Sequence, residues 1–168
     1  MRKLIILKSL VDFVWIVTCV PAVALLLFFG VYIFVNPETI SFVFDNDLNA
    51  DSSMPLAQFF TLTIIAMIGI AIYCFYLFRI TLRYFQKVKP FHDEVIINYN
   101  RIGLLLTITG VLSAIIFFSA RLVLFDEFRL DFGFTPNVML ICLGLFFMVL
   151  SEVFKVAKQA KEENELTV

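Results

Sequence analysis

The chain of 168 residues contains little of what enzymes and disulfide scaffolds are built from: one histidine, one tryptophan and three cysteines, with only 16% of its residues charged. A single histidine does not support a Ser/His/Asp site or a two-histidine metal site, and no HExxH, Walker A or GxGxxG sequence occurs. The cysteines show no CxxC spacing, so no disulfide framework is indicated. We therefore expect a protein that is not an enzyme and that holds no cofactor and no metal.

Long apolar runs dominate what is present. The chain is 61% hydrophobic, and its mean hydropathy is +0.97. A helix rises about 1.5 Å per residue and the hydrocarbon core of a bilayer is about 30 Å thick, so about 20 residues are needed to cross it. Three stretches meet this length outright, over residues 10–35, 56–78 and 102–125, and a fourth, over 138–157, reaches it if Lys155 and Lys158 extend their charged ends toward water. The sequence predicts an all-α integral membrane protein of one domain, in which four transmembrane helices form a bundle within the lipid bilayer.

Lysine and arginine divide unevenly between the segments that join these runs. All but two of the 13 basic residues lie in the N-terminal segment, in the connection 79–101 or after residue 154, and the connection 36–55 has none. Cytoplasmic segments of membrane proteins carry such an excess. We expect a multi-pass membrane protein with its N-terminus and C-terminus in the cytoplasm.

Proline and glycine positions give expectations about the helices themselves. Pro21 removes a backbone donor inside the first run, which predicts a kink near residues 17–21. Gly69 in the second run and Gly110 with Ala114 in the third would let two backbones approach closely. They predict that these two helices are close neighbours, or that the third run serves a homodimer.

Charged residues near the cytoplasmic ends of the runs form one candidate polar cluster, in which helix-end ion pairs are the alternative to a functional site. Its members are Asp12, Arg79, Arg101 and Glu152.

Two features are expected on the outer side. Arg121 should reach the outer interface and form an ion pair with Asp126, with anion recognition as the alternative. Residues 45–51 alternate oxygen-bearing side chains as a calcium loop does, but Ala50 and Leu56 stand where that loop needs Gly and Glu. A solvated turn is therefore favoured there.

The connection 79–101 and the tail 158–168 are the candidate cytoplasmic contacts. The connection is basic and amphipathic and suits the headgroup region, with a break at Pro90 and Asp93 and Glu94 at the start of a following helix. The tail should be helical, with ion pairs four residues apart from Lys158 and Lys161. The residues proposed to meet a partner are Pro90, Phe91, Glu165, Leu166, Thr167 and Val168.

Two stretches resemble a known family. One is KPFHDEV at 89–95 with NRIGLL at 100–105, and the other is LGLFFMVLSEVF at 143–154 with EENELTV at 162–168. Together they resemble the bacterial membrane family known as domain of unknown function 2975. The resemblance covers most of the chain, is specific from Pro90 onward, and rests on hydropathy alone before that. It implies four spans in a bacterial inner (plasma) membrane and, since many members are encoded beside small helix-turn-helix regulators, a membrane partner for such a regulator. It brings no catalytic residue.

Three functions follow from these observations. The first is a non-enzymatic membrane protein that binds a cytoplasmic helix-turn-helix transcription regulator and does not itself bind nucleic acid. The second is a small transporter or channel subunit, suggested by Asp12, Glu152 and Arg121 and opposed by the apolar centre of the spans. The third is an accessory subunit of a larger membrane complex, and homo-oligomers fit any of the three.

Overall fold

The computed structural model describes residues 2–36, 54–87, 91–125 and 135–166, and nearly all of them are helical. Four helical stretches are long and apolar enough to cross a bilayer, which confirms the predicted all-α class and the four predicted apolar helices. The elements are α1 (Arg2–Val14), η1 (Trp15–Cys19), α2 (Val20–Val35), α3 (Met54–Gln86), α4 (Asp93–Phe125) and α5 (Pro136–Leu166).

The first three elements form one continuous helix with a π-helical turn in its middle. Pro21 has no N–H to donate to the carbonyl of Val17, so the regular hydrogen-bond pattern cannot continue there. One residue earlier, the Val20 N–H donates to the Trp15 carbonyl, five residues back. The irregularity predicted at residues 17–21 thus takes the form of η1, a wider turn of the kind that bends helices.

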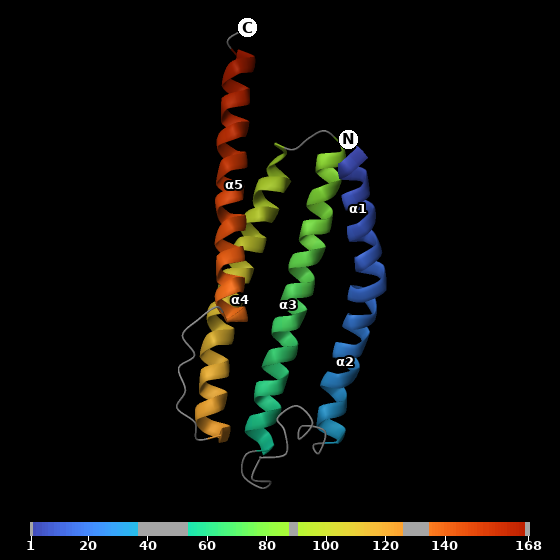
Figure 1. The fold of residues 1–168 in the computed structure, drawn as a ribbon, viewed down its shortest axis with the longest axis vertical. Helices are drawn as coiled ribbons and strands as arrows, with labels where there is room; N and C mark the ends of the chain where they lie inside the picture. The colour runs from blue at the N-terminus through green and yellow to red at the C-terminus, as the bar shows by residue number, and fades with distance from the viewer. Residues whose placement is uncertain (1, 37–53, 88–90, 126–134, 167–168) are drawn as a thin grey trace.

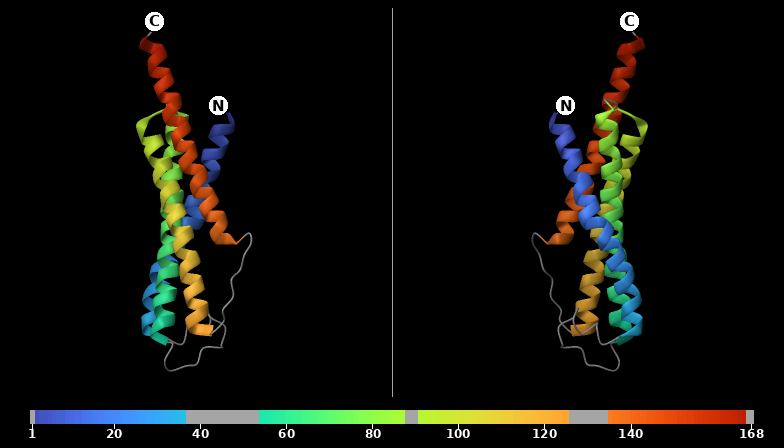
Figure 2. Two further views of the ribbon diagram at one scale, coloured as in Figure 1. Left: turned by 90° about the vertical axis from the view of Figure 1, so that its left-hand side faces the viewer. Right: turned by 90° about the vertical axis from the view of Figure 1, so that its right-hand side faces the viewer.

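The helices pack mainly on their neighbours in the chain (Figure 1). α1 and α2 lie along α3, α3 lies against α4, and the most extensive contact is between α4 and α5. α1 begins and α5 ends at the same end of the molecule. Figure 2 shows that α5 starts part-way along α4 and runs on beyond the ends of the other helices.

α3 and α4 are longer than the predicted spans. Each has 33 residues, or about 50 Å of helix, which exceeds the hydrocarbon core by about 13 residues. Much of the predicted interfacial connection is therefore the last turns of α3 and the first turns of α4, which begins at Asp93 as its acidic first turn predicted. Only residues 87–92 separate the two helices.

Glycines bring the backbones of α4 and α5 together. A Cβ atom added to Gly103 would lie 2.7 Å from the Gly144 carbonyl oxygen, and one added to Gly144 would lie 2.7 Å from the Gly103 carbonyl oxygen. A Cβ atom on Gly110 would lie 3.0 Å from the carbonyl oxygen of Asn137 on α5. The Ser113 hydroxyl, which is buried, lies 2.9 Å from the Asn137 side-chain oxygen. Small residues thus permit this close crossing.

The predicted role of Gly69 is wrong. No atom lies within 4 Å of a Cβ atom added to it, and Gly110 faces α5 rather than α3. α3 and α4 are neighbours, as predicted, but through large side chains instead. Cys74 and Leu77 of α3 are buried in one cluster with Val95 and Tyr99 of α4.

Aromatic rings extend this cluster to the end of α3, the start of α4 and the neighbouring part of α5. Tyr99 stacks on Phe154 with the ring centroids 5.6 Å apart and on Phe147 at 5.7 Å. Phe85 meets the edge of Phe154 at 5.6 Å. Such pairs stabilise packing by about 0.5–1.5 kcal/mol each beyond their buried area. They hold the end of α3 and the start of α4 against α5, next to the charged side chains.

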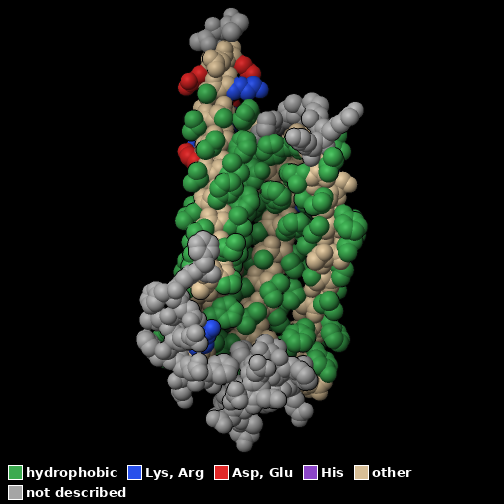
Figure 3. Space-filling model, in the orientation of Figure 1, with side chains coloured by type: hydrophobic (Ala, Val, Ile, Leu, Met, Phe, Trp, Pro, Cys, Tyr) green, Lys and Arg blue, Asp and Glu red, His purple; other side chains and the backbone are tan. Residues whose placement is uncertain are grey.

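Apolar and charged side chains occupy different parts of the surface. Figure 3 shows apolar side chains along most of the visible face, with most of the visible Lys, Asp and Glu on the last turns of α5 and a smaller group of Lys or Arg atoms near the lower end of the view. Only 6% of the most apolar stretch of the N-terminal helix is buried inside the molecule. A surface of this kind fits contact with lipid.

Candidate functional site

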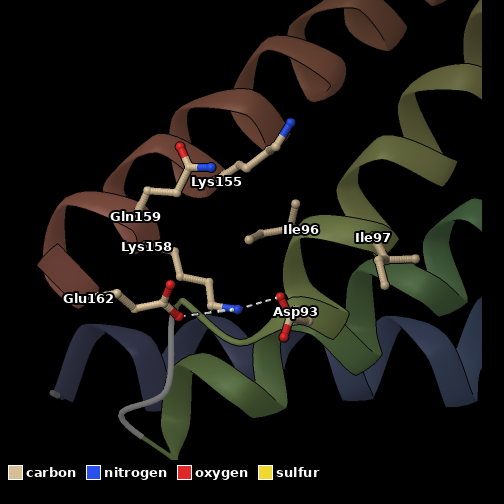
Figure 4. A pocket seen from close by; sticks show the side chains of 7 residues that line it. All are labelled: Asp93, Ile96, Ile97, Lys155, Lys158, Gln159 and Glu162. Atoms are coloured by element: carbon tan, nitrogen blue, oxygen red, sulfur yellow. Dashed lines mark hydrogen bonds and ion pairs between the residues drawn. The ribbon is translucent and has the colours of Figure 1, made fainter.

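A cleft of about 350 Å³ opens between the first turns of α4 and the last turns of α5 (Figure 4). Its position follows from two helix boundaries, because α4 begins at Asp93 while α5 continues past this point. The lining residues are Asp93, Ile96, Ile97, Lys155, Lys158, Gln159 and Glu162.

Charged side chains form the rim of the cleft. The Lys158 ammonium donates to the Asp93 carboxylate at 2.6 Å and lies 3.5 Å from the Glu162 carboxylate, as Figure 4 shows. Lys155, also on the rim, lies 3.5 Å from Glu152. Both signs of charge are present side by side, which suits a partner that itself carries mixed charges.

Isoleucines give the cleft its apolar lining. Ile97 is 47% exposed although it is a large apolar side chain at a charged end of the molecule. The backbone beside it is fixed, because the hydroxyl of Ser151, which is buried, donates to the Ile96 carbonyl at 2.8 Å across the two helices. An apolar floor with a charged rim is the composition of a protein-binding surface.

His92 shapes the start of α4. Its Nδ1 accepts the Glu94 N–H at 3.3 Å, which satisfies one of the free donors at the helix start, and its ring stacks on Tyr84 of α3 at 5.0 Å. Among the described residues, no group of three His, Cys, Asp or Glu side chains is placed to hold a metal ion.

Two members of the predicted polar cluster are in direct contact. The Arg79 guanidinium donates to the Asp12 carboxylate at 2.5 Å, and the Lys8 ammonium lies 3.8 Å from the same carboxylate. The arginine also lies over the Trp15 ring, 5.7 Å from its centroid. Asp12 and Arg79 are 29% and 19% exposed. The arrangement ties α1 to α3 and leaves no free carboxylate at this point.

The other two members are not part of that contact. Arg101 is exposed on α4, and Glu152 is exposed on α5 with Lys155 as its partner. Arg121 lies one turn before the end of α4, and its predicted partner Asp126 is outside the described residues, as is the acidic stretch 45–51.

The residues proposed to meet a partner are placed differently from one another. Phe91 packs on Phe154, with ring centroids 6.2 Å apart, and so contributes to the aromatic cluster rather than to a free surface. Glu165 is exposed and pairs with Lys161 at 3.6 Å, which confirms the predicted ion pair, as the 3.5 Å pair of Lys158 with Glu162 confirms the other. Leu166 is the last residue of α5, and Pro90, Thr167 and Val168 lie outside the described residues.

Sequence reasoning missed the contact of Asp93 with Lys158 and the hydrogen bond from Ser151 to Ile96. Both join residues more than 50 positions apart, so no local pattern reports them. A signal was present in α5, where Asn137, Gly144 and Ser151 recur every seven residues on the face that meets α4.

These features define the class of the molecule, a multi-pass helical membrane protein with a charged cleft at one end. The chain belongs to the family described as "protein of unknown function (DUF2975)", whose model matches residues 7–168. The predicted family is thereby confirmed, over nearly the whole chain. No curated protein and no solved structure matches it.

Proposed function

We propose that this protein is a non-enzymatic membrane partner that docks a small cytoplasmic helix-turn-helix regulator in the cleft between α4 and α5. The observation that carries the proposal is the apolar lining formed by Ile96 and the exposed Ile97 next to charged residues of both signs. A small helical protein with an apolar face and mixed charges is complementary to such a surface. The gene neighbourhood that the family resemblance implies supplies the kind of partner.

The proposal places the cleft, and both chain ends, on the cytoplasmic side of a bacterial inner membrane. The distribution of lysine and arginine supports this side, since the stretch 36–55 has none and the helix ends around the cleft have many. We also propose that the four spans form a bundle within the bilayer. The contacts of each helix with its neighbour support that arrangement.

The transporter alternative receives less support from the contacts. A proton or ion pathway needs carboxylates that are free to change charge within the membrane. Asp12 is held by Arg79, and Glu152 has Lys155 beside it. If the alternative were correct, Asp12→Asn would abolish flux in vesicles.

A charge reversal tests the docking proposal. Lys158→Glu places a third carboxylate in the cleft, whereas Lys161→Glu makes the same change one turn further along α5, outside the cleft lining. With the regulator co-expressed and the complex purified from membranes, we expect Lys158→Glu to lower recovery of the regulator about tenfold and Lys161→Glu to leave it within about twofold. Equal recovery with both variants would remove the cleft from the interaction.

A further inference from the structure

α5 presents two opposite faces, and among the described residues only one of these faces packs against another helix. The face against α4 follows a spacing of four and three residues, through Asn137, Ile141, Gly144, Met148 and Ser151. This spacing averages 3.5 residues and is the repeat of helices that pack along one another.

The opposite face repeats the same spacing without interruption over three heptads. Every residue on it is exposed, with exposed fractions between 56% and 63% at the five positions where a value is given. Its members are Met139, Cys142, Phe146, Val149, Val153, Val156 and Ala160. We refer to these seven residues as the outer seam.

Lipid accounts for only part of this face. Between Met139 and Val149 the whole helix is apolar, as any lipid-facing helix would be. Beyond Glu152 the helix carries lysines and glutamates on its other faces, yet the outer seam continues through Val153, Val156 and Ala160. Apolar residues that keep the heptad positions after the rest of the helix has become charged indicate contact with another helix.

We propose that the outer seam packs against the outer seam of a second copy of this chain, as a parallel and symmetric pair of α5 helices. Two copies inserted in one membrane with the same orientation hold their α5 helices parallel. A parallel symmetric pair brings each seam residue to its own equivalent, so a charged residue there would repel itself. No seam position carries a charge.

The positions beside the seam are compatible with the same arrangement. Among the six flanking residues only one is charged, so the pair meets little like-charge repulsion. They are Leu143, Leu145, Leu150, Glu152, Ala157 and Gln159. A different protein as occupant would not require a seam so free of charge, because opposite charges could then be used to select it.

Disulfide formation between copies in native membranes tests the proposal without disturbing the fold. Cys142 is on the outer seam and exposed, while Cys19 and Cys74 are buried within the molecule. In a parallel pair the two Cys142 residues face each other, and a disulfide needs Cα atoms about 4.4–6.8 Å apart. Oxidation with copper phenanthroline should convert the wild-type chain to a disulfide-linked dimer, and Cys142→Ser should abolish that product.

Cysteines at single positions distinguish packing along the outer seam from chance collisions between copies. On the Cys142→Ser background, Val153→Cys and Val156→Cys should form dimers at least about tenfold faster than Lys155→Cys, which lies between them on another face. Equal rates at the three positions, no dimer at any seam position, or a product of another mass would overturn the proposal. The readout does not involve the regulator, so its failure would leave the docking proposal standing, and failure of docking would leave this one standing.

Discussion

Gly103 of α4 and Gly144 of α5 lie so close that a methyl group on either would stand 2.7 Å from the carbonyl oxygen of the other. The contact lies in the most extensive helix interface of the molecule, and the cleft is at the end of that interface. The geometry of the cleft therefore depends on how closely these two backbones approach.

Gly144→Ala should separate the helices and destabilise the protein. Helix backbone cannot give way as a flexible side chain can, so we expect a loss of about 1–3 kcal/mol in the free energy of unfolding in detergent, followed by circular dichroism. Gly69→Ala is the matched control, because its added methyl group meets no atom within 4 Å. It should be neutral or slightly stabilising, and equal losses in both variants would contradict the account.

Phe154→Ala should destabilise the aromatic cluster. The ring contacts Phe85, Phe91 and Tyr99, which belong to α3, to the segment before α4 and to α4 itself. Truncation of a ring with such contacts removes about 3–5 kcal/mol of stability when the site is fully buried, and Phe154 is half-buried, so we expect about 2–3 kcal/mol. Phe117→Ala, at an exposed position of α4, is the comparison and should cost less than about 1 kcal/mol when unfolding in detergent is followed by circular dichroism.

Asp12→Asn should weaken the attachment of the first helix to α3. The amide keeps the shape of the carboxylate but loses the charge that Arg79 faces, for an expected cost of about 1–2 kcal/mol. In a double-mutant cycle with Arg79→Gln the two losses should be non-additive, because they remove the same contact. Additive losses would show that the pair does not hold the helices together.

The two sides of the membrane can be distinguished by labelling introduced cysteines in intact cells on a Cys142→Ser background, in which the remaining Cys19 and Cys74 are buried. Glu163→Cys, near the end of α5, should react with an impermeant maleimide only after the cells are opened. Asn46→Cys, in the stretch that has no lysine or arginine, should react before opening. The reverse pattern would place the cleft outside the cytoplasm and contradict the proposed function.

The spans could be predicted from the sequence because their signal is composition over about 20 residues, which tertiary contacts do not change. Their ends could not. The charges of the stretch 79–101 suggested an interfacial connection, but contacts of Phe85 and Tyr99 with Phe154 hold most of it as the last turns of α3 and the first turns of α4. Tertiary packing overrode the local pattern there.

Only part of the candidate site could be predicted, because its contacts also depend on tertiary packing. Asp12 and Arg79 could be placed at one membrane depth from sequence, and the structure brings them together. Gly69 and Gly110 looked equivalent in sequence, yet only Gly110 has a helix against it. Which small residue faces a neighbour depends on how each helix is rotated, and the surrounding residues are apolar on every side, so no hydrophobic face reports that rotation.

Capture from native membranes tests the central claim most directly. The full-length chain and a chain ending at Lys158 would each be crosslinked in the cell and purified, and their partners identified by mass spectrometry. The truncation removes Gln159 and Glu162 from the cleft while leaving every predicted span intact. We predict that the full-length chain recovers a helix-turn-helix regulator and that the truncated chain does not. Recovery of the regulator by both chains, or by neither, would contradict docking in the cleft between α4 and α5.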